Sequence, residues 1–376
     1  MLRQPRTLVP FTFPRLVFLF FLWDDEFTTA RSAGSVNGTA VESTGQTRSV
    51  SDSNSVISIA GDQLVINGSL AAQNGYITAL LARTAGRAFA WSVPTRTTLG
   101  AIRYGVATTT LTASSQALGF DYSSGVMRIN DASSTVVSAE GSTSISDFAI
   151  VMFATGGAAW VKISGTWKLT WVLGSGTNDW YWKVMGAAGS ASTINVALEY
   201  LRIRDLSSLL SAAEFASVHT SAVSDSDYTA SAALLCDLAI TAPSSLAGTA
   251  GLKFRKSGTG SGKDYWKVWF NSSGDLLVQR FAADVAQGSP VTLATGVISA
   301  SATRTIRVIA DGANIDFYTL NGSTWTKRGS TQSDSVLSSN TIISPFADTS
   351  WASGGGSVGQ LDAYPRTSSL YNVLDL

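Results

Sequence analysis

One pattern occurs twice in the chain. Residues 146–167 read SDFAIVMFATGGAAWVKISGTW, and residues 304–325 read RTIRVIADGANIDFYTLNGSTW. Each copy has an apolar run, a glycine turn, a second alternating run and a closing tryptophan, with Ile150 matching Ile306 and Gly156 matching Gly312. A repeat of this size indicates two copies of one domain rather than a solenoid of short units.

Between and around these copies the chain reads as short strands separated by Gly, Asn or Ser. Turn signals such as Asn37-Gly38 and Asn67-Gly68 tolerate positive φ and favour reversals of the chain. Strand candidates about ten residues apart predict an all-β fold of antiparallel sandwiches. In the first half they are Ala88–Val93, Leu99–Val106, Ala117–Tyr122, Val126–Asn130, Phe148–Ala154, Ala159–Ile163, Leu169–Leu173, Tyr181–Val184 and Val196–Ile203.

Composition narrows the class of protein. Charged residues make up only 14% of the chain, well below the usual quarter, and Lys plus Arg balance Asp plus Glu at 26 each. Without a basic field we expect no nucleic-acid partner. The single cysteine, Cys236, excludes an internal disulfide and is expected to be a buried small apolar residue.

The N-terminus differs from the rest of the chain. Three prolines and three arginines precede an apolar run that is too short for the roughly 20 residues of a membrane span. We interpret residues 1–23 as an extended docking arm, with assembly contacts from Leu16, Phe18, Phe20 and Trp23. The alternatives are a strand of the protein's own first domain and an export signal.

Two sandwiches in tandem give the expected organisation. Helical spacing occurs at residues 207–219, between the two copies, and predicts a short helix in a linker. The predicted parts are the arm 1–23, a first sandwich 24–205, a linker 206–227, a second sandwich 228–366 and a tail 367–376 that packs onto a domain.

The repeated hairpins resemble those of the concanavalin A-like, laminin-G-like jelly-roll superfamily. The resemblance also includes the closing strands around Leu201 and Leu361 and the opening Asp24-Asp25-Glu26-Phe27. It covers most of 24–205 and 228–366 and implies two tandem antiparallel jelly-roll β-sandwiches. Domains of this kind in Ser-, Thr- and Gly-rich chains of low charge resemble bacteriophage tail or surface proteins.

The sequence contains no recognisable catalytic motif. Glycan hydrolases place carboxylates at alternate positions of one strand, and no strand here carries such a pattern. His219 is the sole histidine and is expected to be exposed and idle, so neither a Ser-His-Asp apparatus nor a zinc site is expected. No cofactor is predicted; a structural calcium ion is left open, with Asp25, Asp205 and Asp362 as scattered candidates.

The aromatic residues carry the remaining signal. Two clusters combine neighbouring rings with a carboxylate: Asp179, Trp180 and Trp182, and then Asp264, Tyr265 and Trp266. Because adjacent residues of a strand face opposite sides, at least one ring of these clusters is expected near solvent, where it could stack on a sugar. The alternative is that these rings fill the sandwich or an oligomer interface.

Together these observations predict a non-enzymatic virion structural protein of a bacteriophage tail or capsid surface. Its partners would be other virion proteins, further copies of itself in a homo-oligomer and a cell-surface glycan. The alternative is a secreted bacterial carbohydrate-binding protein that uses residues 1–23 as its export signal. A glycan hydrolase with an unfamiliar carboxylate pair is a third alternative.

Overall fold

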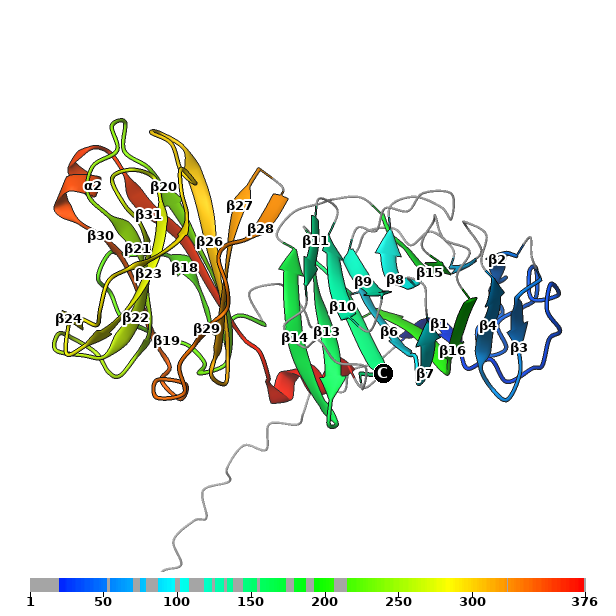
Figure 1. Ribbon diagram of the computed structural model, residues 1–376. Helices are drawn as coiled ribbons and strands as arrows, with labels where there is room; N and C mark the ends of the chain where they lie inside the picture. The colour runs from blue at the N-terminus through cyan, green and yellow to red at the C-terminus, as the bar shows by residue number, and fades with distance from the viewer. Residues whose placement is uncertain are drawn as a thin grey trace, which may run out of the picture.

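The computed structural model confirms an all-β fold built from antiparallel sheets (Figure 1). It describes residues 20–52, 55–69, 75–78, 87–98, 102–107, 118–123, 126–131, 134–137, 145–153, 156–173, 179–186, 193–205, 215–322 and 324–374. No helix among these residues has the length and apolar character needed to cross a membrane.

The first unit contains three sheets. Sheet 1 has the order β1 (Phe20–Asp25), β17 (Tyr200–Asp205), β6 (Arg87–Ser92), β12 (Asp147–Met152), β13 (Gly157–Ile163) and β14 (Thr166–Leu173). Sheet 2 has the order β11 (Ser134–Val137), β10 (Val126–Asp131), β9 (Leu118–Ser123), β8 (Ile102–Ala107), β15 (Tyr181–Gly186), β5 (Gly75–Ile77) and β2 (Ser49–Ser51). Sheet 3 comprises β3 (Ile57–Ile59), β4 (Leu64–Ser69), β16 (Thr193–Leu198) and β7 (Thr95–Thr98).

The second unit contains two sheets and two short helical segments. Sheet 4 runs β18 (Val218–Ser221), β31 (Ser357–Pro365), β20 (Leu234–Thr241), β26 (Thr303–Asp311), β27 (Asn314–Asn321) and β28 (Thr324–Lys327), with β29 (Gln332–Ser333) on β27. Sheet 5 runs β19 (Tyr228–Thr229), β30 (Ile342–Ala347), β21 (Ala250–Lys256), β22 (Tyr265–Phe270), β23 (Leu276–Ala282) and β24 (Val285–Ala286), with β25 (Val291–Ala294) on β23. The helical segments are α2 (Thr349–Ser353) and the 3₁₀ helix η1 (Ser369–Leu374).

Sheets 1 and 4 repeat the same strand order. In both, the first strand of the unit pairs with its last strand, and the repeated hairpin, β12–β13 or β26–β27, lies farther along the sheet. Its turns contain Gly156 and Gly312 at φ of 76° and 51°, a backbone conformation that favours glycine. The duplication that the sequence pattern predicts is therefore visible in the strand order of the described residues.

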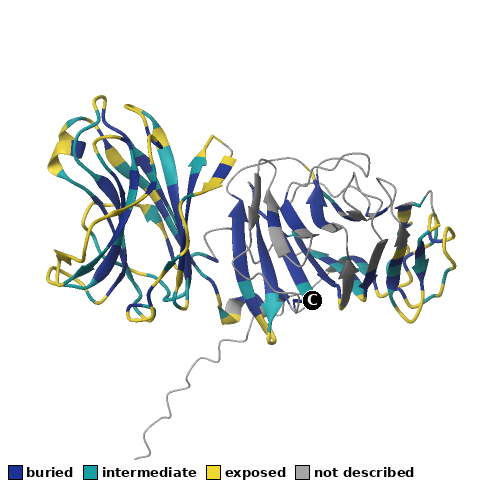
Figure 2. Cartoon of the chain, in the orientation of Figure 1, coloured by how far each residue is buried: buried dark blue, intermediate teal, exposed yellow. Residues whose placement is uncertain are grey.

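Aromatic rings fill the space between sheets 1 and 2. The Trp91 ring stacks on Phe148 of the neighbouring strand at 5.8 Å and meets Trp182 from sheet 2 edge-on at 5.5 Å. Phe120 on sheet 2 lies 4.9 Å from Phe148. In the second unit Phe254 and Phe317 meet across sheets 5 and 4, and Cys236 is buried as predicted. Figure 2 shows the buried strands of both sandwiches in dark blue.

Two predicted boundaries shift for the same reason. Phe20 to Asp25 pair with β17, and Trp23 is only 1% exposed, so this segment is an edge strand of the first unit rather than part of an arm. Val218 to Ser221, predicted as linker, pair with β31 in the same way. An apolar edge strand gains ladder hydrogen bonds and a buried face in its own sheet. Leu16 and Phe18 lie outside the described residues, as does most of the predicted linker helix.

The two units share a packed junction. Trp171 of β14 meets the rings of Tyr318 and Trp325 edge-on at 5.2 and 5.9 Å. The tail then returns to the first unit (Figure 1), where Tyr371 of η1 packs against Trp160 at 5.6 Å. The tail, which the sequence analysis expects to pack onto a domain, thus contacts the first unit.

Candidate functional site

The structure places the first predicted aromatic cluster in the core. Trp180 and Trp182 are 2% and 0% exposed, while Asp179 is exposed. The Trp180 ring packs so closely on Gly157 that a Cβ added there would lie 2.7 Å from a ring carbon. Tyr181, on the opposite face of β15, is partly exposed. The interpretation of Trp180 and Trp182 as a sugar-stacking surface is therefore corrected, because both rings are occupied by protein contacts.

The second predicted cluster is divided between two faces of sheet 5. Trp266 points into the sandwich and donates from Nε1 to Asp334 Oδ2 at 2.7 Å. Tyr265 lies on the outer face, 5% exposed and stacked on Phe281 with ring centroids 5.0 Å apart. Asp264 Oδ1 accepts from the Ala283 N–H at 2.8 Å. These three residues do not form one open binding surface.

The predicted calcium candidates have other partners. Asp25 is buried and accepts two hydrogen bonds from Arg48, at 2.8 Å from Nε and 2.6 Å from Nη2. Oδ1 of Asp362 lies 2.5 Å from Nδ1 of His219. His219 is half exposed, and this contact means that it has a partner. The side chain of Asp205 lies outside the described residues. Within the described ranges, no group of three or more His, Cys, Asp or Glu side chains could hold a metal ion.

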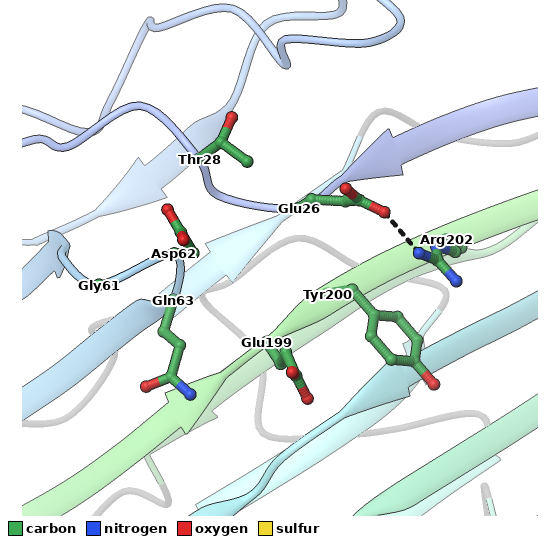
Figure 3. Close-up of a pocket in the computed structure, with 8 residues that line it drawn as sticks. All are labelled: Glu26, Thr28, Gly61, Asp62, Gln63, Glu199, Tyr200 and Arg202. Carbon is green, nitrogen blue, oxygen red and sulfur yellow. Dashed lines mark hydrogen bonds and ion pairs between the residues drawn. The ribbon is translucent and has the colours of Figure 1, made fainter.

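A polar pocket of about 580 Å³ opens instead at the edge of the first unit (Figure 3). It lies where β1 ends, where β17 begins and where a tight turn joins β3 to β4. Its lining residues are Glu26, Thr28, Gly61, Asp62, Gln63, Glu199, Tyr200 and Arg202. Three separate segments of the chain thus supply carboxylates, an amide, a hydroxyl, a guanidinium and one aromatic ring.

Tyr200 is the fixed aromatic element of this pocket. Its hydroxyl donates to Asp147 Oδ1 at 3.1 Å, and Asp147 in turn accepts from the Ser146 hydroxyl at 2.6 Å. Burial raises the pKa of Tyr200, and the Asp147 carboxylate raises it further, so the phenol stays protonated. The ring is therefore held in one orientation before any ligand arrives, which reduces the entropic cost of binding.

Arg202 is held beside the ring by carboxylates. Its guanidinium carbon lies 4.6 Å from the centroid of Tyr200, and Nη2 donates to Glu26 Oε1 at 2.5 Å. Burial lowers the pKa of Arg202, but Glu26 and Asp24 more than offset this and leave the pKa above its ordinary value. The guanidinium is thus permanently charged and oriented, with Glu26 exposed at the pocket rim.

The pocket could not be located from the sequence alone. Glu199, Tyr200 and Arg202 belong to the closing strand around Leu201, and Glu26 belongs to the acidic cluster, but the sequence places these segments far apart. Only the pairing of β1 with β17 brings them together. No local sequence pattern signals that pairing, because the two strands lie at opposite ends of the first unit.

Comparison with known proteins found similar solved structures but no family. No protein-family model and no curated protein matches the chain. Sheep galectin-11 is 13% identical over 37% of this chain and 94% of its own, with a TM-score of 0.29. A laminarinase from Rhodothermus marinus is 13% identical over 50% of this chain and 98% of its own, with a TM-score of 0.35. A carbohydrate-binding module from Bacillus subtilis is 15% identical over 40% of this chain and 91% of its own, with a TM-score of 0.28.

Proposed function

We propose that the protein binds a neutral glycan, without hydrolysing it, in the pocket between the β3–β4 turn and β17. The observation that carries the proposal is the pre-oriented Tyr200 ring inside a rim of hydrogen-bonding side chains. A sugar presents hydroxyl groups at its edge and C–H groups on its faces, so it needs both kinds of partner.

The charge of the pocket favours an uncharged ligand. Three lining carboxylates, Glu26, Asp62 and Glu199, face a single lining cation, Arg202, which is already paired with Glu26. A polyanion would be repelled at this rim. Carboxylates and the Gln63 amide are instead suitable acceptors and donors for sugar hydroxyl groups.

Substitutions in the pocket test the proposal on neutral oligosaccharides selected by a glycan array. Glu199→Ala and Gln63→Ala should each weaken binding about tenfold, since each removes one hydrogen bond worth about 1–1.5 kcal/mol, as calorimetry would measure. Gln287→Ala, on an exposed side chain of the second unit, is the matched control and should bind as the wild type does. Unchanged affinity in both pocket variants would remove the pocket from consideration.

A second pair of variants tests the aromatic ring. Tyr200→Phe keeps the ring but loses the hydrogen bond to Asp147, so it should retain most of the affinity. Tyr200→Ala removes the stacking surface and should reduce binding by about tenfold or more. Thermal melting of both variants shows whether the fold is intact. Release of reducing ends from a bound glycan would contradict the non-enzymatic role.

We also propose where the protein acts. Low charge and an abundance of Ser, Thr and Gly support a virion surface component, with secretion as the alternative. The mass and size of the native protein, measured by mass spectrometry and light scattering, separate the two. A full-length chain in a large assembly supports the virion role, whereas a monomer lacking its first 20 or so residues supports secretion.

A further inference from the structure

The outer face of sheet 5 carries an unusual row of side chains. Alternation along β22 turns Trp266, Val268 and Phe270 into the core. It leaves Lys267 on the outer face, directly opposite Lys253 of β21 on one side and Gln279 of β23 on the other. Two lysines directly opposite each other across neighbouring strands repel one another and destabilise the pairing.

Aromatic rings surround both ammonium groups. The Lys267 Nζ lies 4.3 Å from the ring centroid of Phe346 and 4.8 Å from that of Trp269. The Lys253 Nζ lies 5.6 Å from Phe346 and 5.8 Å from Tyr265. The faces of these rings attract the cations and also remove part of their water.

The two lysines differ in their carboxylate partners. Lys253 lies 3.2 Å from Asp225, a side chain that is 64% exposed. Within the described part of the chain, Lys267 makes no ion pair. Burial lowers the pKa of Lys267 to about 8, and Lys253 lowers it as well, against weaker opposing effects of Asp348 and Asp225. An anion between the lysines would offset both the repulsion and the loss of hydration.

A hollow of about 380 Å³ adjoins this row and is lined in part by Lys253, by Tyr265 and by Ser344, the residue of β30 that pairs with Lys253. Three carboxylates, Asp225, Asp227 and Asp284, also line the hollow, and each already has a partner; that of Asp225 is Lys253. Asp227 accepts from Lys256 Nζ at 2.7 Å and from the Gly260 N–H at 2.9 Å, and Asp284 accepts from the Gly262 N–H. The Phe281 ring, stacked on Tyr265, is partly exposed at the same face. The hollow leaves room for a ring-shaped ligand beside Lys253.

We propose that this face is a second binding site, specific for an acidic sugar whose carboxylate or sulfate lies between Lys253 and Lys267. Its ring would lie beside the partly exposed Phe281. The site is in the other unit from the Tyr200 pocket and has the opposite charge preference, so neither proposal depends on the other.

Oligogalacturonate and its methyl ester test the proposal, because esterification removes the charge of each carboxyl group and adds only a methyl group. The wild type should bind the acid and not the ester. Lys267→Gln should weaken binding of the acid by about 10- to 100-fold, the equivalent of one charge-assisted hydrogen bond. Lys162→Gln is the matched control, since Lys162 also lies over a tryptophan ring, that of Trp167 at 5.6 Å, but in the first unit. Equal binding of acid and ester, or full binding by Lys267→Gln, would overturn the proposal.

The pH dependence of oligogalacturonate binding is a second test, because a lysine with a purely structural role would not change it. The charged groups around Lys267 are Lys253 on β21, Asp225 before β19 and Asp348 after β30, whereas β23 presents the uncharged Gln279 and Phe281. Raising the pH from 7 to 9 deprotonates Lys267, so the affinity for oligogalacturonate should fall, while Lys267→Arg should keep its affinity because arginine stays charged. A heparin oligosaccharide that binds with the same dependence on Lys267 would support a sulfated ligand. Displacement by inorganic sulfate alone, at the affinity of the sugars, would overturn the sugar specificity.

Discussion

Arg307→Ala is expected to lower the free energy of unfolding by about 3–5 kcal/mol, the cost of leaving a buried charge without its partner. Arg307 is fully buried on β26. Its Nε and Nη2 donate to the two carboxylate oxygens of Asp237, both at 2.7 Å. Burial raises the pKa of Asp237 and Arg307 lowers it, so the substitution leaves a carboxyl that is hard to ionise.

The same guanidinium also joins the two units. Nη2 donates to the Val172 carbonyl of the first unit at 2.7 Å. The guanidinium carbon lies 4.4 Å from the ring centroid of Trp171 and 3.9 Å from that of Trp325. The variant should therefore weaken the junction as well as sheet 4, and faster proteolysis between the units would report that loss.

Chemical unfolding followed by tryptophan fluorescence measures the effect. Arg304→Ala is the matched control on the same strand, because Arg304 donates to the uncharged carbonyls of Val297 and Thr303, and its loss should cost less than about 1 kcal/mol. Replacing both partners, as in Arg307→Met with Asp237→Leu, should recover much of the loss, because no buried charge then remains unpaired. A single Arg307→Ala variant as stable as Arg304→Ala would contradict this account.

The parts of the fold that depend on neighbouring residues in the sequence were predictable. Alternating apolar residues and turn glycines are read along one strand and one turn, which is why the hairpins at Gly156 and Gly312 are confirmed. The Asn67-Gly68 turn signal was wrong, since both residues lie inside β4, where pairing with β16 outweighs the preference for a turn.

Features that depend on distant contacts were not predictable. Whether Trp23 docks on a partner or completes its own sheet depends on β17, far along the chain. The Tyr200 pocket depends on the same pairing together with the β3–β4 turn. The junction around Trp171 forms where the two units pack against each other. A sequence pattern within one unit cannot predict these contacts.

The exposure of tryptophan side chains is the clearest example of a feature that the sequence does not predict. Trp182 is such a residue, and its replacement is expected to cause a large loss of stability. Period-2 alternation places Trp180 and Trp182 on one face of β15, but it cannot say that a second sheet covers that face. Trp182 is fully buried and lies 5.5 Å from Trp91, at an interplanar angle of 64°. Its backbone exchanges hydrogen bonds with Thr78, 3.0 Å from the Thr78 N–H and 3.1 Å to the Thr78 hydroxyl.

Trp182→Ala should therefore lower the free energy of unfolding by about 3–5 kcal/mol, because it removes buried ring contacts and leaves a cavity between sheets 1 and 2. Tyr181→Ala, on the neighbouring and partly exposed residue, is the matched control and should cost about 1 kcal/mol. Thermal or urea unfolding separates the two variants directly. If Trp182→Ala kept wild-type stability and lost glycan binding, the ring would be a ligand contact after all and the Tyr200 pocket would not be the principal sugar site.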